Sequence, residues 1–139
     1  MARSIRLKNN DYWCMDYACL FTRGMNLSNL TPWTLFTVPF SNDPNSEFIT
    51  NTSNFERNGN YIKCKFKGKV LVYRQISHNI RYELDIADEF GGIVDVIGGK
   101  NQSLVILNVN YNDDINFMLN TGFDNFTIYN ARLIVVRIA

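Results

Sequence analysis

The sequence has few of the residues on which catalytic and metal sites depend. It contains one histidine and three cysteines in 139 residues. It has no HExxH motif, no paired-cysteine metal spacing and no glycine-rich phosphate loop. The histidine, His78, lies in a turn signal, and the acidic pair Asp113-Asp114 has the same setting. We therefore expect no enzyme active site, no metal and no other cofactor.

The sequence also has no large excess of positive or negative charge and no long apolar run. The net charge is +1, which gives no reason to expect nucleic acid as a partner. No stretch approaches the roughly 20 apolar residues of a membrane span. The first residues, MARSIRLKNNDYW, have no apolar core of the length that a signal peptide needs. We therefore expect no nucleic-acid partner, no membrane insertion and assembly in a cytoplasm.

The cysteines are odd in number, at Cys14, Cys19 and Cys64. An odd set in a chain without a secretory signal predicts free thiols in a reducing compartment. A Cys14–Cys19 disulfide remains the alternative.

The stretch from Tyr61 to Arg74 alternates with a period of two, which is typical of a half-buried strand. One face is apolar and should be buried; it holds Ile62, Cys64, Phe66, Val70 and Val72. The other face carries a ladder of lysines at Lys63, Lys65, Lys67 and Lys69. Gly68 permits a bend or a close backbone approach.

The lysine ladder has two interpretations. It is either a solvated sheet face whose charge prevents edge pairing, or a basic strip that contacts an anionic partner such as an acidic glycan or subunit.

Short strands separated by Gly, Asn and Asp turns continue along the chain, and no useful window has a helical period. One strand is predicted from Trp33 to Phe40 with Trp33 buried, and others are predicted near residues 80–86, 103–109, 115–119 and 126–138. About eight strands at near-regular spacing predict an all-β fold, a jelly-roll β-sandwich. This knob should span residues 30–139.

Residues 1–29 have too few apolar side chains for a core of their own, and we interpret them as an extended N-terminal attachment arm. Its apolar residues either pack on the knob or dock on another protein; they are Ile5, Leu7, Tyr12, Trp13, Leu20 and Phe21.

The last strand is apolar on both faces. Ala131, Leu133, Val135 and Arg137 lie on one face, whereas Ile134, Val136 and Ile138 lie on the other. Only one face can cover the core, so the second should contact a partner or the arm of the same chain.

Three segments resemble the jelly-roll domain shared by tumour necrosis factor and the complement globular head. They are FERNGNYIKCKFKGKVLV (55–72), VNYNDDINFMLNTG (109–122) and NARLIVVRIA (130–139). The resemblance implies a homotrimer with this last strand at the threefold axis. Because Arg137 is costly to bury in a core, we expect the face of Ala131, Leu133, Val135 and Arg137 at that axis.

The opening SIRLKNNDYW resembles the "IKLKNN-x-YWD" opening of small bacteriophage structural proteins, with Cys14 where an Asp is more usual. That resemblance implies a virion protein assembled in the bacterial cytoplasm: a trimeric fibre or decoration bound to other virion proteins through residues 1–29. The alternative is a tail tip that binds a receptor or a host surface glycan. A cupin-like enzyme would need several histidine or carboxylate ligands, which one histidine cannot provide.

Overall fold

The computed structural model describes residues 15–80, 84–87 and 101–139, and these residues form an all-β molecule. Within them, no helix is long and apolar enough to cross a membrane. The elements are β1 (Tyr17–Thr22), β2 (Met25–Leu27), β3 (Phe36–Thr37), the 3-10 helix η2 (Phe40–Asn42), β4 (Glu47–Thr50), β5 (Phe55–Asn58), β6 (Tyr61–Cys64), β7 (Gly68–His78), β8 (Leu84–Ala87), β9 (Gln102–Val109), β10 (Asp114–Ile115), β11 (Met118–Thr121) and β12 (Phe126–Arg137).

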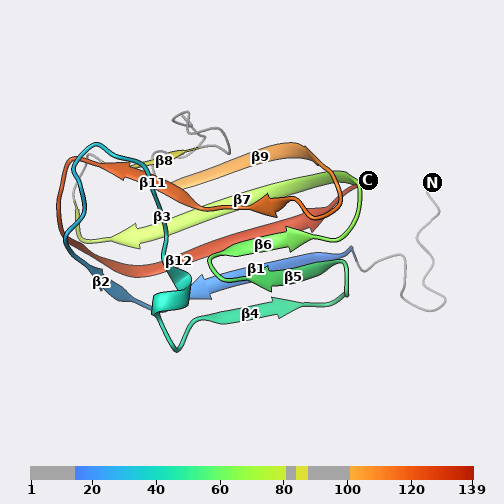
Figure 1. Cartoon of the computed structure of the whole chain (residues 1–139), viewed down its shortest axis with the longest axis horizontal. Coiled ribbons are helices and arrows are strands. Elements are labelled where there is room, and N and C mark those ends of the chain that lie inside the picture. Colours follow the sequence, from blue (N-terminus) through green and yellow to red (C-terminus); the bar gives the residue numbers. More distant parts are fainter. Residues whose placement is uncertain (1–14, 81–83, 88–100) are drawn as a thin grey trace.

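The strands form two layers (Figure 1). One layer is a single sheet, the large sheet, with the order β4-β1-β12-β7-β9 and with β2 paired to β12. The other layer consists of two three-stranded sheets, β10-β6-β5 and β3-β11-β8. All of these pairings are antiparallel. The predicted two-layer β-sandwich is therefore present.

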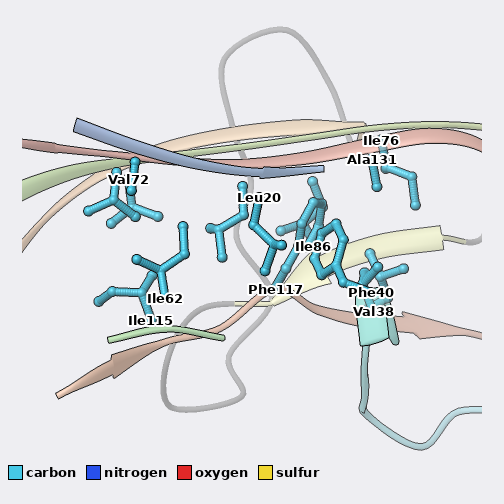
Figure 2. Close-up of a cluster of buried hydrophobic side chains, with 14 of the residues drawn as sticks. Leu20, Val38, Phe40, Ile62, Val72, Ile76, Ile86, Ile115, Phe117 and Ala131 are labelled. Carbon is cyan, nitrogen blue, oxygen red and sulfur yellow. The ribbon is translucent and has the colours of Figure 1, made fainter. Parts of the chain in front are cut away.

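The core lies between the layers, where alternate side chains of each strand meet (Figure 2). Leu20 and Val72 enter it from the large sheet, and Ile62, Ile115 and Phe117 enter it from the opposite layer. The burial predicted for one face of residues 61–74 is confirmed, because Ile62, Cys64, Phe66, Val70 and Val72 are all buried.

The stretch predicted as one strand is in fact two strands in opposite layers. Its first part is β6 and its second part is β7, and the chain crosses between the layers at residues 65–67. The predicted close approach at Gly68 is confirmed, since a Cβ atom there would lie 2.4 Å from the carbonyl oxygen of Ala139. An unbroken alternation cannot reveal the crossing, because both strands bury side chains in the same core.

The boundary predicted at residue 29 is wrong, because β1 and β2 belong to the sandwich. β1 lies between β4 and β12, and its Ala18 and Leu20 are completely buried. Leu20 is therefore a core residue and not part of an arm. The arm residues Ile5, Leu7, Tyr12 and Trp13 lie outside the described residues.

The strand predicted from Trp33 to Phe40 is mostly irregular. Only Phe36 and Thr37 pair, with β11, and a 3-10 turn begins at Phe40. Trp33 was expected to be buried, but it is 60% exposed. Thr31-Pro32-Trp33-Thr34 forms a turn, closed by the amide of Thr34 donating to the carbonyl of Thr31 at 3.3 Å.

The sandwich has two distinct ends. At one end, the arm end, β1 begins and β12 finishes: the amide of Arg137 donates to the carbonyl of Asp16 at 2.9 Å, and the C-terminus lies there in Figure 1. The carboxylate of Asp16 also accepts a hydrogen bond from Asn54 Nδ2 at 2.6 Å. The opposite end, the loop end, holds β2 and the connections around Trp33 and Gly122.

Candidate functional site

The strongest candidate for a functional surface is the outward side of the large sheet. Side chains in a strand alternate, so the neighbours of the core residues in β1, β4, β7, β9 and β12 point away from the core. The strand register aligns them in two rows that cross the sheet. The row nearer the arm end is Tyr17, Val136, Leu71 and Ile106, and the next is Ile49, Cys19, Ile134, Tyr73 and Leu104. We call these nine residues the outer apolar face.

The outer apolar face is not covered by the described parts of the chain. Ile106 is 59% exposed, Leu104 is 50% exposed, and Tyr17 and Ile49 are also exposed. Antiparallel sheets commonly bury one face and present polar residues on the other. Five adjacent strands with apolar side chains directed outward therefore mark a contact surface.

Polar residues occur along both borders of the outer apolar face. The next row toward the loop end contains Glu47, Arg132, Gln75 and Gln102, together with the aromatic residue Phe21. Toward the arm end, Lys69 pairs with Asn108 across β7 and β9. An apolar centre with a polar border is the usual anatomy of a protein–protein interface.

The predicted trimer-interface residues point the opposite way. Ala131, Leu133 and Val135 are completely buried in the core of the same chain, so they cannot lie at an axis between chains. Arg137 does not prevent this face from covering the core. Its guanidinium lies 4.2 Å from the centre of the Phe66 ring, at the edge of the core, and 4.0 Å from the Asp16 carboxylate. The free face of β12 is the one that carries Ile134 and Val136.

A hollow of about 370 Å³ lies where the outer apolar face meets its border toward the loop end. Its lining is Cys19, Phe21, Thr22, Arg23, Asn130, Arg132 and Ile134. Phe21, predicted as an arm residue, thus lies on the sheet and not on a separate segment. Arg23 pairs with Glu47. Burial raises the pKa of the Cys19 thiol, and the charge of Arg132 opposes that shift, so burial disfavours the reactive thiolate form of Cys19.

The four lysines do not form one strip. Lys63 and Lys65 belong to the β6 region, where Lys63 lies 3.2 Å from Asp114 and Lys65 lies 3.5 Å from Glu56. Lys67 is exposed at the crossing between layers, and Lys69 is on β7 in the large sheet. Since two of these charges already have acidic partners and the set is split between layers, a continuous anion-binding strip is not present.

The remaining polar candidates have structural partners. His78 Nε2 lies 2.8 Å from Asn101 Oδ1, and His78 Nδ1 accepts a hydrogen bond from the amide of Ile80. Asp113 accepts one from the amide of Asn110, which closes the turn before β10. Among the described residues, no three His, Cys, Asp or Glu side chains cluster as a metal site would require.

The thiols are free where they are described, at Cys19 and Cys64. Burial is the main cause that raises the pKa of Cys64 to about 12, and the charges of Asp113 and Asp114 add to it. Cys64 is therefore a buried core thiol, as its position in the alternation predicts. Cys14 lies outside the described residues.

The sequence contains signals for the outer apolar face in addition to the last strand, which is apolar on both sides. VLVY (70–73) and LVIL (104–107) are also apolar in both phases. Three such segments predict a sheet that is covered on both faces. The contributions of β1 and β4 could not be found this way, because their place beside β12 depends on long-range pairing.

No protein-family model matches the chain, and no curated protein matches its sequence. Solved structures do resemble it. PRD1 vertex protein P5 is 11% identical with a TM-score of 0.65, and the alignment covers 90% of this chain and 98% of that one. Murine APRIL at pH 8.0 is 12% identical with a TM-score of 0.57, covering 88% of this chain and 99% of that one. At these identities the likeness shows the fold alone, and the predicted jelly roll is confirmed.

Proposed function

We propose that this chain is a structural protein of a bacteriophage virion: a homotrimeric jelly-roll fibre or decoration held on the capsid by the residues that precede β1. The observation that carries the proposal is the outer apolar face, which five strands build and which needs a partner. The fold of the phage PRD1 vertex protein supports a place in the virion. The opening SIRLKNNDYW, with its resemblance to small phage structural proteins, supports it independently.

Three copies around a threefold axis would cover the outer apolar face from both sides. In a cyclic trimer each chain uses two different patches, one for each neighbour, and the ring closes without leaving an exposed edge. The face extends across five strands, so it can provide both patches. A stable interface needs about 800 Å² from each partner, which a broad sheet face provides more readily than a loop.

If the threefold axis runs along the sandwich, the two ends of the trimer are different. Rotation about the axis keeps all three chains parallel, so all three arm ends lie together and all three loop ends lie opposite. The three Asp16 residues, which precede β1, and the three C-termini then lie at the same end of the trimer. This arrangement suits a knob that is attached at one end and free at the other.

Deletion of residues 1–14 tests the attachment. Because β1 begins at Tyr17, the shortened chain should fold and form trimers, but it should not be incorporated into particles. The matched control is a deletion of residues 1–29, which removes the buried Ala18 and Leu20 and should prevent folding. Full incorporation of the 1–14 deletion into particles would contradict attachment through this segment.

The alternative function, a tail tip that binds a receptor or glycan, is favoured by one observation: the exposed Trp33 at the loop end. In that case saturable binding to host cells would accompany a tail location.

A further inference from the structure

The loop end carries a tryptophan that the fold itself does not explain. Trp33 is 60% exposed, although tryptophan is among the side chains that gain most from burial. Its backbone φ is +59°, in the left-handed region that a bulky residue rarely adopts. Exposure and backbone strain in the same residue indicate that Trp33 contacts another molecule, because such strain is retained where it serves function.

The surrounding structure holds Trp33 in place. It occupies the third position of the turn Thr31–Thr34, where Pro32 fixes the preceding φ and where glycine or asparagine is the usual residue. The amide of Trp33 donates to the carbonyl of Thr121 at 2.7 Å, which ties the turn to the end of β11.

The indole ring packs closely against Gly122. A Cβ atom on Gly122 would lie 2.5 Å from Cζ2 of Trp33, so only glycine leaves room for the ring at this place. Phe123 follows directly and is 40% exposed. The indole therefore lies against the backbone at Gly122 and is otherwise largely exposed, and the second exposed aromatic residue, Phe123, is the sequence neighbour of Gly122.

In the described segments at residues 28–34 and 121–125, the groups near the indole are polar but not basic. The loop at residues 28–30 joins the turn after β11 through the amide of Leu30, which donates to the carbonyl of Asp124 at 3.0 Å. Asn29, Asp124 and Asn125 are exposed there and offer amide and carboxylate groups. Neither segment, residues 28–34 or 121–125, contains Lys, Arg or His.

We propose that Trp33 and the adjoining turn at residues 122–125 form a binding site for a neutral carbohydrate. A sugar ring has an apolar C–H face that stacks on a flat aromatic ring, while its hydroxyl groups need amide and carboxylate partners at the rim. The site offers both. The absence of positive charge in the two segments disfavours sialylated or sulfated glycans, since anionic ligands are bound by Arg and Lys.

This site goes beyond the structural role proposed above. It uses residues at the loop end and none of the outer apolar face, so it does not depend on trimer formation or on a place in the virion. In a trimer it would occur three times at the free end, and a surface bearing many glycans would then be bound with avidity.

The test uses the purified full chain on an array of immobilised neutral glycans (hexose and N-acetylhexosamine oligomers) beside sialylated and sulfated ones. Saturable binding to at least one neutral glycan is expected. Trp33→Asn should weaken it by about tenfold or more while the melting temperature stays unchanged or rises, because asparagine relieves the positive φ. The control is Tyr111→Asn, which removes an equally exposed aromatic residue (60%) near the arm end and should leave binding unchanged.

A second measurement follows the indole directly. The chain has two tryptophans, so Trp13→Phe leaves Trp33 as its only one. A neutral glycan that binds on the array is then titrated in solution into the Trp13→Phe chain. Its binding should shift the fluorescence emission of Trp33 to the blue. The proposal is overturned if no neutral glycan binds, if only anionic glycans bind, or if Trp33→Asn binds as well as the natural chain. A large fall in melting temperature for Trp33→Asn would also overturn it, since Trp33 would then serve the fold.

Discussion

The substitution Ile134→Asp places a charge at the centre of the outer apolar face without touching the core. Ile134 lies in the middle of its row, between Cys19 of β1 and Tyr73 of β7. It is half-buried in the single chain, so an aspartate there can remain hydrated as long as the chain is alone. We therefore expect the knob to fold normally and the trimer to dissociate.

The size of the effect follows from the symmetry. A carboxylate buried at an interface without a partner costs several kcal/mol, and we take about 2 kcal/mol per copy as a lower value. In a closed trimer the substitution occurs three times, which weakens association by about 6 kcal/mol, or roughly 10⁴-fold. Because the assembly of three chains depends on the square of the chain concentration, the concentration at which half of the chains are trimeric rises about 100-fold. A trimer that is half-assembled near about 1 µM would then be monomeric at that concentration.

The neighbouring residue provides the matched control, because Val135 points into the core and is completely buried. Val135→Asp should unfold the chain, with a loss of about 4 kcal/mol or more in the free energy of unfolding. Light scattering reports the mass, and circular dichroism reports the fold. The reasoning is refuted if the natural chain is a monomer at micromolar concentration, or if Ile134→Asp remains a trimer.

Two further predictions concern the core and the arm end. The Cys64 thiol should resist a thiol reagent in the native chain and react quickly after denaturation. The pKa of this thiol is raised from 9.0 to about 12 in the folded chain. The contribution of the protonated thiol to stability is therefore complete below pH 9 and is lost as the pH rises through 12. Denaturation of the natural chain and of Cys64→Ala at several pH values would show this loss. Gly68→Ala should lower the free energy of unfolding by about 1–3 kcal/mol, since the new methyl group meets the Ala139 carbonyl. Gly59→Ala has no atom within 4 Å, and its positive φ alone should cost about 1 kcal/mol in the same denaturant titration. Equal losses at both glycines would contradict the close approach at Gly68.

The sequence was most informative where one face of a strand is buried and the other is polar. The alternation from Ile62 to Val72 predicts its buried residues correctly, because a side-chain period of two is a local property. The same local signal cannot show that the chain crosses from one layer to the other at residues 65–67. Both strands keep their phase toward a shared core, and only the pairing partners differ.

The errors have a common physical origin in long-range contacts. β1 has a short apolar stretch, YACLFT, and its burial depends on lying between β4 and β12, which are far away in the sequence. The orientation of β12 was inferred from the cost of burying Arg137. That cost does not arise, because the strand ends at the edge of the core, where the guanidinium lies over Phe66. The expected burial of Trp33 rested on a strand from Trp33 to Phe40, whereas a turn tied to Thr121 presents this residue to solvent.

A place in the virion is the central claim, and labelling of intact particles tests it most directly. An antibody raised against residues 15–139 would be applied to purified particles and located by electron microscopy. We predict label at fixed positions on the capsid, with three copies of the chain at each, and loss of that label from particles assembled with the 1–14 deletion. Label confined to the tail would favour the receptor- or glycan-binding tip. Particles that contain no copy of the chain, intact or disrupted, would contradict the account.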